Sequence, residues 1–129
     1  MVSVAINWIS AQNNDAYITL DSQRRIYISS GARNIIGLPN KAPFYLTLGY
    51  DEESRRLVCA KPENVKADVA PFKFDKRSYN KAASKVLQTA GFREEDLPLR
   101  FYMVGEGEAA KQAYVAYPEG VYAFELSRI

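Results

Sequence analysis

Histidine is absent from this 129-residue sequence, and cysteine occurs once, at Cys59. Without histidine, Ser-His-Asp catalysis, Cys-His catalysis and most zinc sites are excluded. A single cysteine cannot form an internal disulfide, which suits a reducing compartment, so we expect a cytoplasmic protein. Cys59 stands in an apolar run, and we expect it to be a buried core residue rather than a reactive thiol.

Long apolar runs are also missing. The opening stretch, MVSVAINWIS, is apolar, but it is too short to span a membrane and has no basic leader. We therefore expect neither a signal peptide nor a membrane partner. Residues 1–15 are interpreted as an N-terminal arm, with Trp8 and Ile9 packed onto the body of the protein.

Few side chains suited to acid–base catalysis stand at positions that indicate an active site. Carboxylate pairs such as Glu52 and Glu53 fall in expected turns, where carboxylates are usually solvated. Ser29 and Ser30 have no base beside them in the sequence. We expect no catalytic residue, no cofactor and no metal site, so the sequence does not indicate an enzyme.

Basic side chains, in contrast, are present in clusters, although the net charge is only +2. Such clustering fits a basic face that binds nucleic acid, and it fits solvated turns equally well. The clusters comprise Arg24 and Arg25, then Arg33, then Arg55 and Arg56, then Lys73, Lys76, Arg77, Lys81 and Lys85.

Apolar periodicity predicts an α+β fold that is mainly β, and a hydrophobic fraction of 47% suffices for a core. Strands are expected over residues 17–20, 25–28, 43–50, 55–61, 72–75, 97–105, 113–117 and 121–126. One short helix is expected over residues 31–36, with Ser29 or Ser30 as N-cap and Gly37 at its end. A longer helix is expected over residues 77–90, ending at Gly91.

The two halves of the chain share a pattern. Asp21 and Gly37 are 16 residues apart, as are Asp75 and Gly91, and an aromatic-rich hairpin is expected after each glycine. We interpret this as a duplicated strand–helix–hairpin unit over residues 16–64 and 71–129, the second with a longer helix and a C-terminal strand. Chance similarity between two short α+β stretches is the alternative.

The segment DSQRRIYISSGARNIIGL resembles the core signature of the AbrB/MazE/SpoVT swapped-hairpin family, and the resemblance extends over residues 16–62. It implies two such units interleaved into one small β-barrel, whose basic surface docks on duplex DNA. A chain that carries both units would be similar to MraZ-like proteins. The matching positions are Asp21, Arg25, Ile26, Ile28, Arg33, Gly37 and Leu38.

The sequence also departs from the family pattern. Arg24 stands where the family often has glycine, Ser29 where proline often opens the helix, and Asn34 where a second basic residue often follows. In the second half, Tyr79 occupies the position of Arg25, which argues against symmetric reading of palindromic DNA. Positive charge in that half is expected on the long helix instead, through Lys76, Arg77, Lys81 and Lys85. The alternative is that this basic helix face is simply solvated.

The expected function is therefore that of a DNA-binding transcriptional regulator. Arginine presents a planar fork that suits phosphate or guanine, so Arg24, Arg25 and Arg33 are the main candidate contacts. The alternative for these residues is that Arg25 pairs with Asp21 to hold the turn and Arg33 is merely solvated.

The alternative function is a protein-binding module, such as an antitoxin-like protein or a phage-type inhibitor of a host factor. Tyrosine is enriched in protein interfaces, and the chain has nine. A monomeric pseudo-dimer and a homo-oligomer both remain open. The candidate interface tyrosines are Tyr45, Tyr50, Tyr102, Tyr114, Tyr117 and Tyr122.

Overall fold

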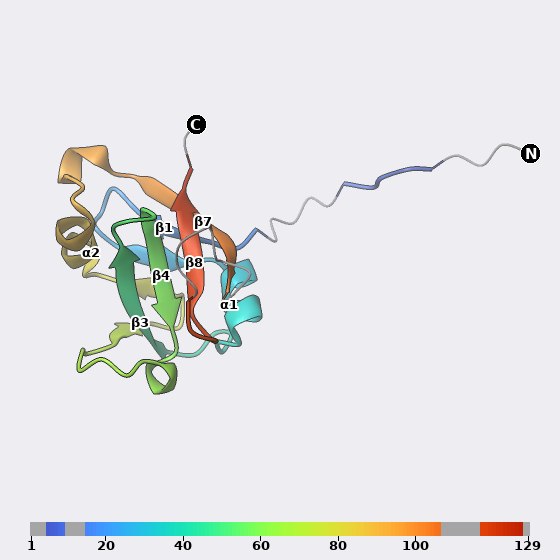
Figure 1. Cartoon of the computed structure of the whole chain (residues 1–129). Helices are drawn as coiled ribbons and strands as arrows, with labels where there is room; N and C mark the ends of the chain where they lie inside the picture. Colours follow the sequence, from blue (N-terminus) through green and yellow to red (C-terminus); the bar gives the residue numbers. More distant parts are fainter. Residues whose placement is uncertain (1–4, 10–14, 107–116, 128–129) are drawn as a thin grey trace, which may run out of the picture.

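The computed structural model describes residues 5–9, 15–106 and 117–127 of the chain. The strands form one antiparallel sheet in the order β5-β3-β4-β8-β7-β1-β2-β6, with two helices at its periphery (Figure 1). The two ends of this order also meet, because the Asp75 amide donates to the Tyr79 carbonyl at 3.0 Å and joins β5 to β6. The result is a nearly closed barrel, which confirms the expected mainly β class.

In the first half of the chain, the strands and the helix lie close to their expected positions. The strands are β1 (Tyr17–Leu20), β2 (Ile26–Ile28), β3 (Phe44–Asp51), β4 (Arg56–Ala60), β5 (Phe72–Phe74), β6 (Tyr79–Asn80), β7 (Leu99–Glu106) and β8 (Tyr122–Leu126). The helices are α1 (Ser30–Ile36) and α2 (Ala83–Ala90), with short 3-10 turns at Pro62–Asn64 and Glu94–Asp96. None of the helices that the structure describes is long and apolar enough to cross a membrane.

Strands from the two halves alternate in pairs around the barrel. β1 pairs with β7, placing Leu20 opposite Leu99, and β5 pairs with β3, placing Phe74 opposite Phe44. Each half therefore completes the sheet of the other, and both contribute to a single core.

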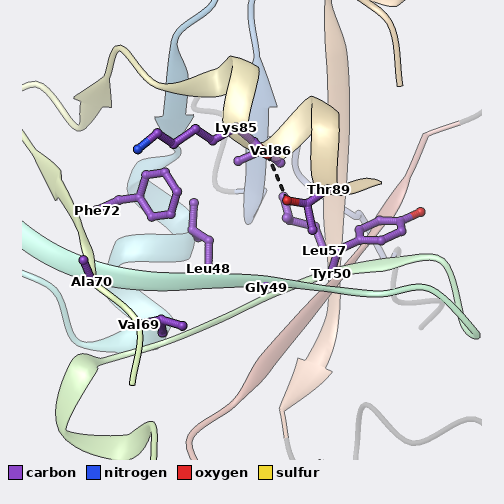
Figure 2. Close-up of a pocket in the computed structure, with 10 residues that line it drawn as sticks. All are labelled: Leu48, Gly49, Tyr50, Leu57, Val69, Ala70, Phe72, Lys85, Val86 and Thr89. Atoms are coloured by element: carbon purple, nitrogen blue, oxygen red, sulfur yellow. Dashed lines mark hydrogen bonds between the residues drawn. The ribbon is translucent and has the colours of Figure 1, made fainter. Parts of the chain in front are cut away.

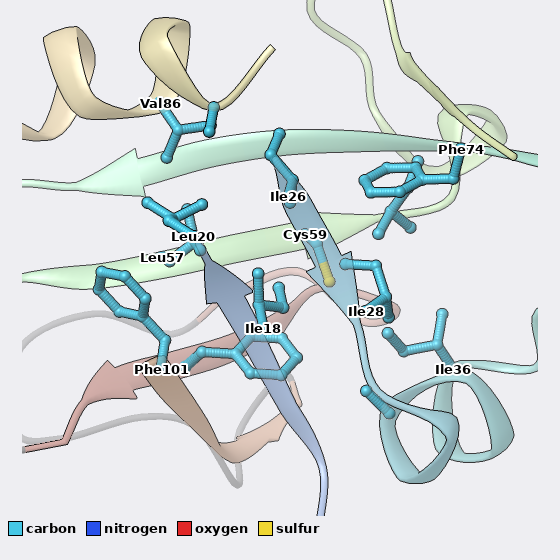
Figure 3. Close-up of a cluster of buried hydrophobic side chains, with 14 of the residues drawn as sticks. Ile18, Leu20, Ile26, Ile28, Ile36, Leu57, Cys59, Phe74, Val86 and Phe101 are labelled. Atoms are coloured by element: carbon cyan, nitrogen blue, oxygen red, sulfur yellow. The ribbon is translucent and has the colours of Figure 1, made fainter. Parts of the chain in front are cut away.

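The core fills the inside of the barrel. Ile18 and Ile28, from β1 and β2, have no exposed surface, and Figure 3 shows them pointing toward Leu57 and Cys59 of β4. This alternation of inward and outward side chains is what half-buried strands require. Cys59 is buried as expected, and burial raises the pKa of its thiol, so it is an apolar packing group.

Helix α1 begins one residue before the expected start and ends at Ile36 as predicted. The Ser29 hydroxyl accepts a hydrogen bond from the Ala32 amide at 3.1 Å, and Gly37 ends the helix with a φ of 85°. The same hydroxyl donates to the Asp15 carbonyl and accepts from the Tyr17 amide. Ser29 therefore caps α1 and fixes it to the start of β1.

The longer helix expected over residues 77–90 is wrong in its first part, because α2 begins only at Ala83. The Asp75 carboxylate accepts from the Arg77 and Tyr79 amides, and Ser78 has a φ of 70°, which a helix does not allow. Residues 77–78 therefore form a turn, and Tyr79 begins β6. With 8 residues against 7 in α1, α2 is not the long helix expected.

Two further expectations concern the segment after β7 and the N-terminal arm. Strand β7 pairs with β8 and with β1, and the strand expected over residues 113–117 falls almost entirely outside the described residues. Tyr117 lies outside any strand, and residues 113–116 lie outside the described part of the chain. In the arm, Trp8 is 86% exposed and Ile9 is 95% exposed, so neither packs onto the body of the protein.

Candidate nucleic-acid interface

The turn between β1 and β2 is held by the Asp21 carboxylate. Its Oδ1 accepts from the Gln23 and Arg25 amides at 3.0 and 2.9 Å, and its Oδ2 pairs with Arg25 Nε at 2.8 Å. Arg24 occupies the left-handed region with a φ of 61°. The pairing of Arg25 with Asp21, which the sequence left open, is thus present and fixes the guanidinium in place.

The turn between β5 and β6 repeats this arrangement. Asp75 Oδ1 accepts from the Arg77 and Tyr79 amides at 2.8 and 3.1 Å, and Ser78 takes the left-handed conformation of Arg24. Tyr79 therefore stands in the second turn where Arg25 stands in the first.

Strands β2 and β6 form a short antiparallel ribbon that separates the two turns. Ile26 lies opposite Asn80, and Tyr27 lies opposite Tyr79. Because each turn immediately precedes its strand and the strands are antiparallel, the turns lie at opposite ends of this ribbon.

Four tyrosines line the outer face of β6, β2, β1 and β7, and are here termed the tyrosine ladder. The ring centroids of Tyr27 and Tyr79 are 4.9 Å apart, those of Tyr17 and Tyr27 are 6.3 Å apart, and those of Tyr17 and Tyr102 are 5.7 Å apart. These spacings are typical of interacting aromatic pairs. The face between the turns is therefore aromatic rather than aliphatic.

Two arginines lie over rings of the ladder. Arg25 Cζ is 4.3 Å from the centroid of Tyr79, and Arg100 Cζ is 4.2 Å from that of Tyr17. Arg100 Nε also donates to the Thr19 hydroxyl at 3.2 Å. Cation–π contacts of this kind restrain a guanidinium, which orders it before a ligand arrives.

Arg33, on α1, also lies near the ladder. Its side chain is half-buried, and its buried Nε has no hydrogen-bond partner within the described residues. Burial is the main reason that the pKa of Tyr27 is raised, and the nearby Arg33 charge offsets part of that rise. Arg33 thus places near this face a guanidinium whose Nε makes no hydrogen bond within the described residues.

The remaining predicted basic residues do not form a helix face. Lys76 and Arg77 are exposed on the second turn, Lys81 is exposed between β6 and α2, and only Lys85 lies on α2. The expectation of a basic helix is therefore wrong. Of these four residues, only Lys76 and Arg77 lie together, on the turn.

Arg24 contacts the 3-10 turn Glu94–Asp96 of the second half of the chain. Its guanidinium pairs with Glu94 at 3.2 Å, with both side chains more than half exposed. Exposed pairs of this kind contribute little, about 0–1 kcal/mol, so the contact is easily exchanged for another anion.

Arg100 and three of the four ladder tyrosines were not identified as site residues from the sequence. Of the tyrosines proposed for an interface, Tyr102 belongs to the ladder, and Tyr114 lies outside the described residues. A usable signal existed in β7, where Arg100 and Tyr102 alternate with the inward-facing Phe101.

Within the described ranges, no three His, Cys, Asp or Glu side chains gather in a way that could hold a metal ion. Comparisons of the chain with protein-family models, with curated proteins and with solved structures find no match. The geometry of the interface is therefore the basis for assigning a function.

Proposed function

We propose that the chain is a DNA-binding transcriptional regulator of AbrB-like type that contacts duplex DNA with the face described above. The observation that carries this proposal is the pair of carboxylate-held turns at opposite ends of the β2–β6 ribbon. Each turn presents two basic residues, Arg24 and Arg25 in one and Lys76 and Arg77 in the other.

A duplicated swapped-hairpin unit accounts for this arrangement. Ile26 and its partner Asn80 are 54 positions apart, as are Asp21 and Asp75, so an approximate twofold axis through the pair would exchange the turns. The pairing of β1 with β7 and of β5 with β3 is the interleaving that two such units require. The chain would then correspond to a dimer of single units within one molecule.

Electrostatics favour phosphate as the ligand of this face. Basic side chains position a protein on duplex DNA by neutralising phosphates and releasing counterions, which makes binding strongly dependent on salt. Arg25 is held by Asp21 and Tyr79, and Arg100 by Tyr17 and Thr19. Because these guanidiniums are already ordered, little side-chain entropy is lost on binding.

A mobility-shift assay on random and genomic duplexes, titrated with salt, tests the proposal. We expect binding that weakens steeply with salt and is lost in Arg24→Ala/Arg25→Ala. Arg55→Ala/Lys66→Ala is the matched control, because it removes the same charge from exposed sites outside the interface strands. An unshifted duplex at about 50 mM salt, where even non-specific contacts bind, would contradict the proposal.

The tyrosine ladder favours a second candidate, a protein-binding module. Tyrosine and arginine are enriched among residues that dominate protein–protein binding, and this face combines four tyrosines with Arg25 and Arg100. Such a protein would be an antitoxin-like or phage-type inhibitor of a host factor. A pull-down from nuclease-treated lysate that recovers a stoichiometric partner with wild type but not with Tyr27→Ala would support it.

A further inference from the structure

A groove lies between α2 and β3, away from the tyrosine ladder, and is here termed the α2 groove. It encloses about 260 Å³. Figure 2 shows Leu48 of β3, Val86 of α2 and Phe72 of β5 around the same space, with Lys85 at the rim. Val69 also lines the groove and is 55% exposed, so apolar surface is left open to solvent.

The N-terminal arm also leaves large apolar side chains exposed to solvent. Residues 5–9 extend away from the barrel (Figure 1). Ile6, Trp8 and Ile9 are 55%, 86% and 95% exposed. Burying a side chain of this size stabilises a protein by about 1.5–3 kcal/mol, so the arm is a segment with a strong drive to bind an apolar surface.

We propose that the arm of one copy occupies the α2 groove of a second copy, with Trp8 as the inserted side chain, and that two copies exchange arms reciprocally. The groove volume of about 260 Å³ lies just below the ~300 Å³ at which small-ligand pockets begin, which suits one aromatic side chain. Residues 1–14 contain no charged side chain, so no ion pair contributes to this contact. The association is therefore insensitive to salt, unlike DNA binding.

The strand order explains why the occupant comes from another copy. The arm leads into β1, and β1 is four strand spacings from β3 in either direction around the barrel. Four spacings correspond to about 19 Å. The seven peptide units from Trp8 to Asp15 (15 − 8 = 7) reach at most about 25 Å. An arm wrapped around its own barrel would therefore have to be almost fully extended to place Trp8 in the groove, whereas the groove of a second copy imposes no such constraint.

The experiment uses Trp8 as its own reporter, because it is the only tryptophan in the chain. Fluorescence emission and sedimentation are measured on nuclease-treated, full-length protein over a range of concentrations. We expect a dimer to form as concentration rises, with a blue shift of the Trp8 emission at the same midpoint. Neither change should depend on salt.

Variants on both sides of the contact complete the test. Ile9→Ser on the arm and Val69→Glu or Thr89→Glu at the groove should each abolish the dimer and the blue shift, and all three sites are exposed enough for folding to be unaffected. Ile35→Glu is the matched control, because Ile35 is 54% exposed and lies on α1.

Three results would overturn the proposal. The first is a monomer with solvent-exposed Trp8 emission at every concentration. The second is a blue shift that does not change with concentration, because that would place the arm on its own barrel. The third is a dimer that persists in Ile9→Ser.

Discussion

The guanidinium of Arg25 lies 4.3 Å from the centroid of the Tyr79 ring, and the two residues hold the same place in two turns 54 positions apart. Arg25 of the first turn therefore contacts, across the β2–β6 ribbon, the ring of Tyr79, which occupies the equivalent position in the second turn. The asymmetry noted in the sequence has a structural use, since Tyr79 orders Arg25 rather than contributing a second charge.

Removing the Tyr79 ring should weaken DNA binding without removing any charge. A cation–π contact at an exposed site is worth about 0.5–1 kcal/mol, which corresponds to a loss of about two- to fivefold in affinity for Tyr79→Ala. Tyr79→Phe keeps the ring and should bind as the wild type does. Fluorescence anisotropy on a labelled duplex at fixed salt compares them, and equal affinity of Tyr79→Ala and Tyr79→Phe would argue against this role.

Arg100 should behave as a phosphate contact although it lies on β7, far from the turns in sequence. Arg100→Ala is expected to lower affinity for all duplexes alike and to reduce the salt slope by about 1. Arg93→Ala is the control, since Arg93 is 76% exposed and pairs only loosely with Glu95, at 3.7 Å. A slope unchanged in Arg100→Ala would remove Arg100 from the interface.

The carboxylates of both turns should contribute to stability. Asp75→Ala loses two amide hydrogen bonds and is expected to lower the free energy of unfolding by about 1–2 kcal/mol. Asp21→Ala should cost more, because Arg25 also loses its ion-pair partner. Urea unfolding measures both, with Asp68→Ala in an exposed loop as the reference. If Asp75→Ala matches Asp68→Ala, the turn is not held by its carboxylate.

Phe74 should be among the most costly core positions to truncate. It is fully buried and stacks on Phe44 with ring centroids 5.0 Å apart, where β5 joins β3. Phe74→Ala is expected to lower the free energy of unfolding by about 3–5 kcal/mol, and Phe74→Leu by much less. Chemical denaturation of the two variants gives the comparison, and similar values would mean that the site collapses around the smaller side chain.

Acid should selectively remove the stabilisation supplied by Asp51. Burial raises the pKa of this carboxyl, but hydrogen bonds from the Tyr117 hydroxyl and from Ser54 outweigh it, so the pKa is lowered from 3.8. Because the folded pKa lies below the unfolded value, the stabilisation is complete above about pH 3.8 and disappears as pH falls through the folded pKa.

Asp51→Asn tests this directly. Its deficit in unfolding free energy relative to the wild type should be constant near neutral pH and should shrink in acid. Tyr117→Phe, which removes one of the stabilising donors, should show a smaller deficit with the same pH dependence. A deficit in Asp51→Asn that is independent of pH down to strong acid would contradict the assignment.

Turn-forming and helix-capping residues made much of the first half of the chain predictable. Asp21 signals its turn by accepting amides two and four residues ahead, Ser29 caps α1, and Gly37 ends it. The start of α2 was missed because apolar spacing continues back through Tyr79, while the left-handed conformation of Ser78 breaks the helix. Asp75 stands before that turn as Asp21 does before the first, so the same signal was available there.

The candidate interface could be predicted only in part. Arg25 and Arg33 stand in a recognisable local pattern, but the ladder depends on contacts between distant strands. Tyr17 meets Tyr102 and Arg100 only because β1 pairs with β7, a pairing that no local feature of either strand specifies. Alternation indicates which side chains face outward, and it does not indicate which strand lies alongside.

The interleaved strand order also has a consequence during synthesis. Leu20 emerges from the ribosome 79 residues before its partner Leu99 (99 − 20 = 79), and at about 5–20 residues per second this is a delay of about 4–16 s. For that time β1 has an unpaired edge and no complete core to cover its apolar side. The nascent chain is thus exposed to chaperones and to pairing with neighbouring nascent chains, and slower translation of the second half would lengthen that exposure.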